Sequence, residues 1–297
     1  MSAQVARGRL DETYDRTVAA LAAEDGRIVP FALGGDRARD GGGLADAVAR
    51  ARDGKTVFAS GPLAVVAGTE YGVVRTEVAP SRASVKIVAR DGGLTGVGAR
   101  DRLLLEDVGV MRGIPGMTVV VPADAPTTEA ATHALATRDG PAYLRLAADE
   151  RPTVTDGSFR LGTAAELRAG SDLTVVALGA MVERALTIAA EFRQVGVSVR
   201  VLDLASVKPF DEAAVLRAAR DTGALLTAEE HGLPTGIGTL IAAVTAENYP
   251  VPVRRVGVPD VFAGPDDGGD PFDRLGLSLA RMRDEAWELL RQRGKVQ

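Results

Sequence analysis

The chain has 297 residues, of which 46% are hydrophobic, and a formal net charge of −5 with acidic and basic residues interspersed. This length and apolar content predict two folded domains of ordinary size and exclude a disordered chain. The mild negative charge excludes a basic nucleic-acid-binding surface, and the lack of cysteine excludes both disulfides and a thiolate nucleophile.

The sequence carries no conventional metal or membrane signal. His133 and His231 are its two histidines, and they lie too far apart for the spacing of a metal site. No apolar run is long enough to span a bilayer, and residues 1–10 lack the apolar core of a signal peptide. We therefore expect a soluble, cytoplasmic protein with neither a nucleic-acid nor a membrane partner.

The first half of the chain alternates predicted helices and strands. Helices are expected at residues 10–23, 44–52 and 63–78. Strands are expected at residues 28–33, 56–60 and 85–89. Residues 34–43 are expected to form a loop with five glycines, and the glycine-rich loop at 91–98 is of the kind that often lets a ligand approach the backbone.

Residues 103–146 give the clearest pattern. Leu104, Val108 and Met111 follow helical spacing, and a β-branched strand is expected at 118–121. A helix at 126–137 then leads to a second buried strand at 142–146. Two such strands joined by a helix predict a right-handed βαβ unit with a parallel sheet.

The second half repeats the alternation after a polar segment, 148–161, that we interpret as a linker because it has turn residues and little periodicity. Strands are expected at 173–178, 197–203, 224–228 and 251–256, and helices at 182–195, 211–222, 236–247 and 277–293. The sequence thus predicts the α/β class: two consecutive α/β domains with mostly parallel sheets, at 1–150 and 165–297, joined by residues 151–164.

Several motifs in a fixed order resemble the transketolase family. Residues 106–117 (EDVGVMRGIPGM), 121–124 (VPAD) and 140–146 (GPAYLRL) resemble its pyrimidine-binding domain, in the version shared with 1-deoxyxylulose-5-phosphate synthase and the pyruvate dehydrogenase β subunit. Residues 170–177, 203–211 and 227–231 resemble its C-terminal domain. The resemblance covers the chain from about Gly54 onward.

The resemblance implies thiamine diphosphate as cofactor, held between two domains. In the family, a second domain binds the diphosphate and Mg²⁺ through a Gly-Asp-Gly motif followed by an asparagine. This sequence has one asparagine, Asn248, and no Gly-Asp-Gly upstream of it. We therefore expect a split enzyme whose partner, an N-terminal-type transketolase subunit, holds the metal, with a homodimer of this chain inside a heterotetramer. A truncated fragment, or a free-standing subunit with another role, is the alternative.

The family's catalytic glutamate hydrogen-bonds the cofactor's aminopyrimidine ring, and its motif is absent here. Counting back from Gly54 without a gap places Asp40 at that position, so Asp40 is the candidate catalytic and cofactor-binding carboxylate. The alternative is an ordinary solvated loop acid. The same register places Pro62 and Val65 where aromatic residues usually stack on the pyrimidine. Apolar contact is kept, but without an aromatic ring a stacking energy of about 1 kcal/mol is lost.

The loop after residue 88 also departs from the family. Arg102 falls near a family histidine, and because arginine stays protonated it can bind an acidic group but cannot act as a base. Arg90, Arg100 and Arg102 are therefore candidate ligands for an acidic substrate, and Asp91 stands where transketolases keep a substrate-facing aspartate. The alternative is a surface loop with ordinary charges.

Three further residues are candidate interface positions by resemblance. Glu106 and Asp107 begin a helix near the family's domain interface, and His231 follows two acids at a predicted strand end. Two functions remain open. The first is a thiamine-diphosphate-dependent subunit that transfers a two-carbon ketol or acyl unit. The second is a scaffold or regulatory subunit that kept the fold and lost the chemistry.

Overall fold

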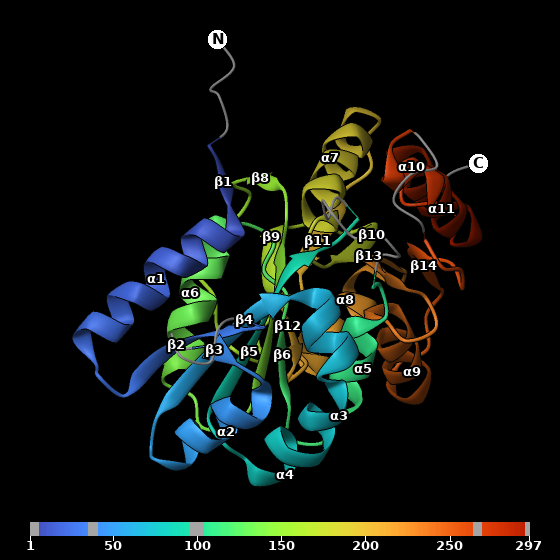
Figure 1. Cartoon of the computed structure of the whole chain (residues 1–297). Coiled ribbons are helices and arrows are strands. Elements are labelled where there is room, and N and C mark those ends of the chain that lie inside the picture. Colours follow the sequence, from blue (N-terminus) through green and yellow to red (C-terminus); the bar gives the residue numbers. More distant parts are fainter. Residues whose placement is uncertain (1–5, 35–40, 95–103, 264–268, 295–297) are drawn as a thin grey trace. The chain divides into compact units, whose positions relative to one another are not determined.

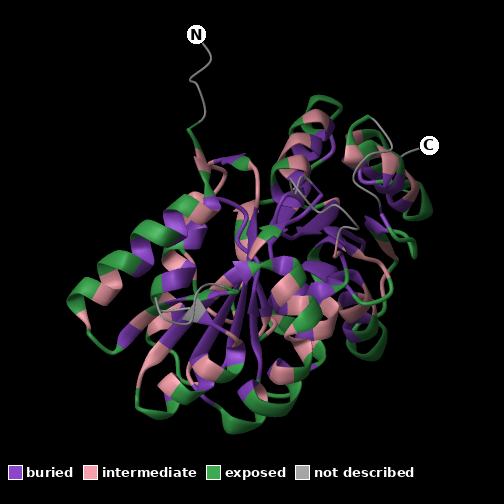
Figure 2. Cartoon of the chain, in the orientation of Figure 1, coloured by how far each residue is buried: buried purple, intermediate pink, exposed green. Residues whose placement is uncertain are grey.

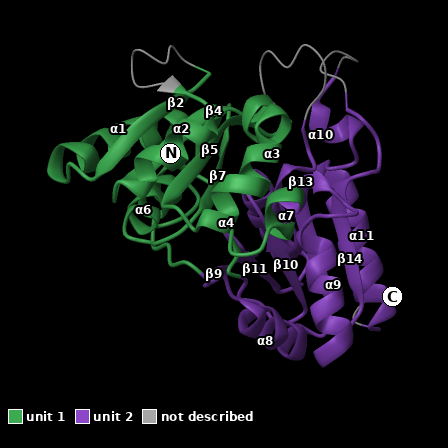
Figure 3. Ribbon diagram, turned by 60° about the horizontal axis from the view of Figure 1, so that its bottom comes forward, with its two compact units in different colours: residues 1–97, 110–161, 207–209 green, residues 98–109, 162–206, 210–297 purple. Residues whose placement is uncertain are grey.

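The computed structural model describes residues 6–34, 41–94, 104–263 and 269–294. These residues form two compact units, which we call unit 1 and unit 2 (Figure 3). Unit 1 comprises residues 1–97, 110–161 and 207–209, and unit 2 comprises residues 98–109, 162–206 and 210–297. Two short segments are thus exchanged between the units. Residues 98–109 belong to unit 2 although unit 1 residues flank them, and residues 207–209 belong to unit 1 although unit 2 residues flank them.

Unit 1 is built on a seven-stranded sheet of order β12-β6-β7-β5-β4-β2-β3 (Figure 1). Its strands are β2 (Ile28–Leu33), β3 (Gly41–Gly42), β4 (Thr56–Pro62), β5 (Val85–Gly92), β6 (Thr118–Val120), β7 (Ala142–Ala147) and β12 (Ser206–Lys208). The pairs from β6 through to β3 are all parallel. Every residue of β6 and β7 is buried, as expected where helices cover both faces of a parallel sheet.

The helices of the first half alternate with the strands along the sequence. They are α1 (Leu10–Glu24), α2 (Leu44–Arg52), α5 (Asp107–Gly113) and α6 (Ala125–Ala136). The segment after β4 consists of η2 (Ala64–Thr69), α3 (Tyr71–Val73), η3 (Val74–Val78) and α4 (Ala79–Ser81), where η denotes a π-helix. Helices α1 and α6 pack together, and their apolar side chains join those of β5, β6 and β7 in one core cluster.

Unit 2 is built on a five-stranded sheet of order β14-β13-β10-β11-β9. Its strands are β9 (Ala165–Arg168), β10 (Leu173–Ala177), β11 (Val199–Asp203), β13 (Leu225–Gly232) and β14 (Val253–Val258). Four strands are parallel, and β9 is an antiparallel edge strand. The helices are α7 (Met181–Gln194), α8 (Glu212–Thr222), α9 (Ile237–Asn248), α10 (Pro271–Arg274) and α11 (Leu279–Gln292). Figure 2 shows buried strands and helices that are exposed on their outer faces.

The predicted class, α/β with mostly parallel sheets, is confirmed, although several segments differ from the sequence pattern, among them the expected helix at 63–78 and the expected linker. The single helix expected at 63–78 contains two π-helical stretches, and Glu70 N donates to Val65 O at 2.9 Å, five residues back. Hydrophobic spacing does not distinguish this wider turn from an α-helix. The segment interpreted as a linker contains β8 (Glu150–Pro152), which pairs antiparallel with β1 (Arg7–Arg9).

A buried lysine joins β5 to the carboxyl end of α6. Lys86 is fully buried, and its Nζ donates to Arg138 O at 2.5 Å and to Gly140 O at 2.6 Å. Both carbonyls belong to the turn that follows α6, and each accepts a hydrogen bond from the buried ammonium. Burial nevertheless lowers the pKa of Lys86 to about 8, and the charge of Arg138 adds to the decrease.

We expect Lys86 to make the stability of unit 1 depend on pH. Because its pKa is about 8 in the folded protein and 10.5 in the unfolded chain, the unfolded chain binds more protons between these values. The unfolding free energy of the native protein should therefore rise with pH across this window, by about 1 kcal/mol per pH unit relative to Lys86→Met. Urea unfolding followed by circular dichroism measures the difference, and parallel pH profiles would contradict the assignment.

Candidate functional site

The carboxyl ends of β2, β4 and β5 lie at one edge of the unit 1 sheet. The parallel register pairs Ala32 with Ser60 and Pro62 with Arg90. β3 pairs with the last residues of β2, which places the start of α2 at the same edge. We call these strand ends and the start of α2 the unit 1 edge. In open α/β sheets, ligand sites lie outside the carboxyl ends of the strands.

Pro62 and Val65, the predicted pyrimidine contacts, lie at the unit 1 edge. Pro62 ends β4 and is exposed, whereas Val65 belongs to η2 and is half-buried. Their neighbours Leu63 and Val66 point into the core, with exposures of 6% and 0%. The edge therefore offers an apolar surface for a ring, without an aromatic side chain at either predicted position.

Arg90, predicted to bind an acidic substrate group, is already paired within unit 1. Its Nη1 lies 3.0 Å from Asp15 Oδ2, and its Nη2 bonds to the other oxygen of the same carboxylate. The guanidinium also lies over the Tyr14 ring, 5.4 Å from the centroid. Burial opposes the charged form, but Asp15 raises the pKa of Arg90 above its usual value. An anionic ligand would have to compete with Asp15 for this group.

Asp91 has an unusual backbone conformation. Its φ is +60°, in the left-handed region that costs a non-glycine residue about 1–3 kcal/mol, and its side chain is exposed. Such conformations persist where the surrounding structure fixes them, and they gather at functional sites. The other predicted loop residues, Asp40, Arg100 and Arg102, lie outside the described residues.

A carboxylate that the sequence pattern did not single out lies at the unit 1 edge. Glu70 follows η2, is half-buried, and its Oε2 accepts a hydrogen bond from Leu44 N at 3.1 Å. Gly43 caps α2 without a side chain, and Asp46 Oδ2 accepts from Gly43 N at 3.0 Å. No sequence signal marks Glu70, because it falls inside an apparently ordinary helix and its partner is 26 residues away.

The residues at this edge fit the pyrimidine half of thiamine diphosphate. A Cβ on Gly43 would lie 3.3 Å from Glu70 Oε1, so a side chain at residue 43 would crowd that oxygen. Val65 supplies apolar surface on the segment that also carries Glu70. A ring nitrogen needs an accepting carboxylate and its face needs apolar contact, and both are present.

His231 lies in a buried acidic environment at the end of β13. Its side chain is 1% exposed, and its Nδ1 lies 3.7 Å from Glu229 Oε2. The Glu229 carboxylate is fully buried and accepts from Ile237 N at 2.7 Å and Gly238 N at 2.8 Å, the first amides of α9. Glu229 thus serves as the N-terminal cap of α9, where the helix dipole favours a negative charge.

The two predicted interface acids differ in accessibility. Glu106 is exposed, and its Oε2 accepts from Leu105 N at 2.9 Å, whereas Asp107 is 1% exposed. Gly232 N donates to Leu105 O at 2.8 Å, which ties this segment to the end of β13. Within unit 2, Glu106 is therefore the member of the pair that is available to a partner.

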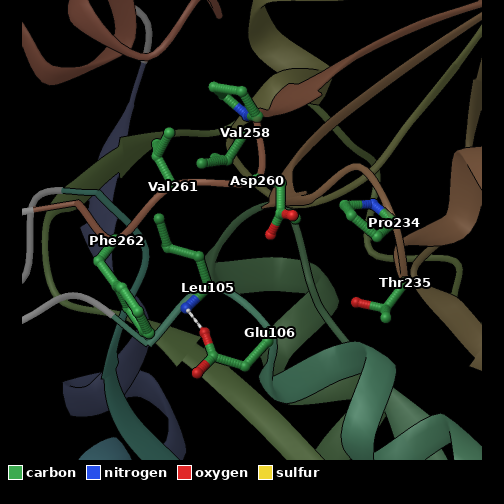
Figure 4. Close-up of a pocket in the computed structure, with 10 residues that line it drawn as sticks. Leu105, Glu106, Pro234, Thr235, Val258, Asp260, Val261 and Phe262 are labelled. Atoms are coloured by element: carbon green, nitrogen blue, oxygen red, sulfur yellow. Dashed lines mark hydrogen bonds between the residues drawn. The ribbon is translucent and has the colours of Figure 1, made fainter.

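Unit 2 has a pocket of about 300 Å³ at the ends of β13 and β14. It is lined by Leu105, Glu106, Gly232, Pro234, Thr235, Val258, Pro259, Asp260, Val261 and Phe262. Figure 4 shows the side chains of Leu105, Val261 and Phe262 on one side and those of Asp260 and Thr235 on the other. The pocket combines an apolar wall with two carboxylates, those of Glu106 and Asp260. Its volume is at the small end of the range for ligand sites, about 300–1,000 Å³.

In residues 6–34, 41–94, 104–263 and 269–294, no three His, Asp or Glu side chains are grouped so as to hold a metal ion. In the same ranges, no helix combines the length and apolar character needed to cross a membrane.

Comparison with known proteins gives consistent matches. Residues 162–282 match the family described as Transketolase, C-terminal domain. The chain is 44% identical over 194 residues to the 6-deoxy-6-sulfo-D-fructose transketolase subunit SqwH of a Clostridium species, covering 64% of this chain and 60% of the relative. It is 34% identical over 246 residues to an apulose-4-phosphate transketolase subunit of Phocaeicola vulgatus, covering 82% of this chain and 78% of the relative.

Solved structures agree with these relatives. A split-gene transketolase, described as an inactive β4 tetramer, superposes with a TM-score of 0.84 at 30% identity, covering 95% of this chain and 98% of that chain. A transketolase from Pichia stipitis superposes with a TM-score of 0.78 at 15% identity, over 98% of this chain and 47% of that chain. The second match concerns the fold alone.

Proposed function

This chain belongs to the transketolase family and corresponds to the C-terminal subunit of a split transketolase, and we propose that it acts in a thiamine-diphosphate-dependent transfer of a two-carbon ketol unit. The observation that supports this most strongly is the extended likeness to proteins that are themselves transketolase subunits. A partner of the N-terminal type would hold the diphosphate and Mg²⁺, in a heterotetramer around a homodimer of this chain.

The unit 1 edge is proposed to face the cofactor's pyrimidine ring. Bound thiamine diphosphate supplies a carbanion at its thiazolium carbon, which carries the transferred unit. Pro62 and Val65 provide the apolar contact, and a carboxylate must accept a hydrogen bond from the ring nitrogen. The sequence register proposes Asp40 for that role, and Asp40 lies outside the described residues.

We further propose a ketose substrate with an anionic end. The two relatives named above act, by their names, on a sulfonated and on a phosphorylated sugar. Arg90, Arg100 and Arg102 are the proposed cations, and Asp91 the proposed acid facing the substrate hydroxyls. Because Asp15 pairs with Arg90, Asp15→Asn should free this guanidinium and lower the KM for the anionic sugar. A steady-state KM that is unchanged or higher would remove Arg90 from the substrate site.

The proposed contact with the partner subunit lies at the predicted interface positions. Glu106 is exposed and lines the pocket of unit 2, which supports a direct contact with a partner. Asp107 and His231 are buried and would act by holding that segment and the end of β13 in place.

Co-expression tests the proposal. The chain is produced with a transketolase subunit that carries Gly-Asp-Gly and asparagine ligands, and thiamine diphosphate binding and turnover of ketose phosphates are measured. We expect saturable, Mg²⁺-dependent binding by the complex and none by either chain alone. A complex that binds no cofactor and turns over no ketose would refute the proposal.

The alternative, a scaffold that has lost the chemistry, is favoured by one observation: neither Pro62 nor Val65 offers a stacking ring. A complex that binds the cofactor without any turnover would support it. Turnover of a ketose by the complex, with both subunits required for that turnover, would exclude it.

A further inference from the structure

We infer that Glu70 supplies the carboxylate that hydrogen-bonds the aminopyrimidine ring, in place of the glutamate that the transketolase family keeps on another segment. This inference rests on the proposed function, because it assigns a role toward thiamine diphosphate. It would make Glu70 a catalytic residue that neither the motifs nor the sequence register indicates.

The first reason is where the side chain starts. Glu70 directly follows η2, and its N–H donates to Val65 O at 2.9 Å. The carboxylate and the apolar residue proposed to contact the ring thus belong to one rigid turn. The strand before this turn, β4, ends at the unit 1 edge beside β5, where ligands of parallel sheets bind.

The second reason is how the carboxylate is held. Oε2 accepts from Leu44 N at 3.1 Å in the first turn of α2, a position where the helix dipole stabilises an ionised acid. Within the described residues no donor bonds to Oε1. One oxygen therefore orients the group, and the other is available to accept a hydrogen bond from a ring nitrogen.

The third reason is the glycine beside it. A Cβ at Gly43 would lie 3.3 Å from Oε1 and 3.6 Å from Oε2, so a longer side chain there would cover the carboxylate. Gly43 has extended backbone angles, φ −92° and ψ 173°, which any residue can adopt. Its lack of a side chain is thus not required by backbone conformation, and it keeps the carboxylate open.

A plain capping role for Glu70 is the competing explanation, and the Glu70→Gln substitution separates the two. Glutamine keeps an oxygen that can accept the Leu44 N–H, so the cap and the fold are retained. A neutral amide cannot serve as the anionic acceptor that drives the ring toward its reactive tautomer. Glu77→Gln is the matched control, because Glu77 is an exposed acid on η3 of the same segment.

The readout is deuterium exchange at the thiazolium carbon of thiamine diphosphate bound to the assembled complex, followed by acid quench and NMR. We expect exchange to slow by about 10²–10⁴-fold in Glu70→Gln, while Glu77→Gln keeps the native rate. Thermal unfolding of each variant checks that it folds, and Glu70→Asp, which keeps the charge, should retain more exchange than Glu70→Gln.

The outcomes are distinct. Native exchange in Glu70→Gln, or slowed exchange in Asp40→Asn alone, would overturn the assignment and leave the proposed function standing. If Glu70→Gln does not fold, exchange in Glu70→Asp at the native rate overturns the assignment, and slowed exchange supports it. If the native complex binds no cofactor at all, the proposed function fails first and this inference fails with it.

Discussion

Glu229→Ala is expected to lower the free energy of unfolding of unit 2 by about 3–5 kcal/mol. The carboxylate is fully buried and accepts from Ile237 N and Gly238 N, so its removal leaves two amides of α9 without an acceptor away from water. Each such orphaned donor costs about 1–3 kcal/mol, and the helix loses the charge at its positive end as well.

The measurement can be made specific to unit 2. Trp287 is the single tryptophan of the chain, and it packs in α11 against Phe192 of α7 with ring centroids 4.6 Å apart. Its fluorescence during guanidinium unfolding therefore reports on this unit. Glu166→Gln is the control, because the exposed Glu166 forms only a surface ion pair with Arg200 and should change stability by less than about 1 kcal/mol. Equal effects of the two substitutions would contradict the capping role.

Gly170→Ala is expected to cost about 3 kcal/mol and to loosen the pairing of β10 with β11. A Cβ at this position would overlap Arg200 N and Val199 C, which are backbone atoms at the start of a buried strand. The neighbouring hydrogen bond, Asp172 N to Ser198 O at 2.9 Å, fixes the two segments at this separation. Overpacking against backbone cannot be relieved by a rotamer change, so the strand must shift.

The same fluorescence experiment checks Gly170→Ala, with Gly232→Ala as the matched control. At Gly232 the nearest atoms to an added Cβ, Leu105 O and Pro234 Cδ, lie at an ordinary contact distance of 3.8 Å. We expect the control to change stability by less than about 0.5 kcal/mol. A native-like midpoint for Gly170→Ala would show that the segment before β10 can move away from β11.

Glu229 also matters for function, because it lies near the end of β13. Gly232 bonds to Leu105, and Leu105 and Glu106 come directly after the loop that carries Arg100 and Arg102 in the sequence. A loosened β13 end would change how Leu105 and Glu106 are held. We therefore expect Glu229→Ala to reduce turnover of the assembled complex as well as its stability.

Local patterns predicted most of the regular structure. The helix Leu44–Arg52 and the strand Ile28–Leu33 have the predicted bounds, because apolar spacing and the Asp53-Gly54 stop are properties of neighbouring residues. The parallel pairing of the strands was also predictable from the sequence, because strands that alternate with helices have few other ways to pair.

The candidate site was less accessible to such reasoning. Arg90 was predicted to bind substrate, and the structure pairs it with Asp15, which lies 75 residues earlier and comes near because α1 packs on the sheet. No local pattern marks Glu70, because its carboxylate contacts Leu44 N, which lies 26 residues away in the sequence. Neither contact can be predicted from the spacing of residues along the chain, because the partners are far apart in sequence.

The sequence by itself determined the class of the fold, most of its strands and helices, and the family, because these follow from local periodicity and from contiguous motifs. The tertiary structure alone decided which charged groups are engaged and which remain available. The physical reason is that a carboxylate finds its partner through strand register and helix packing, over distances in sequence that no local pattern encodes.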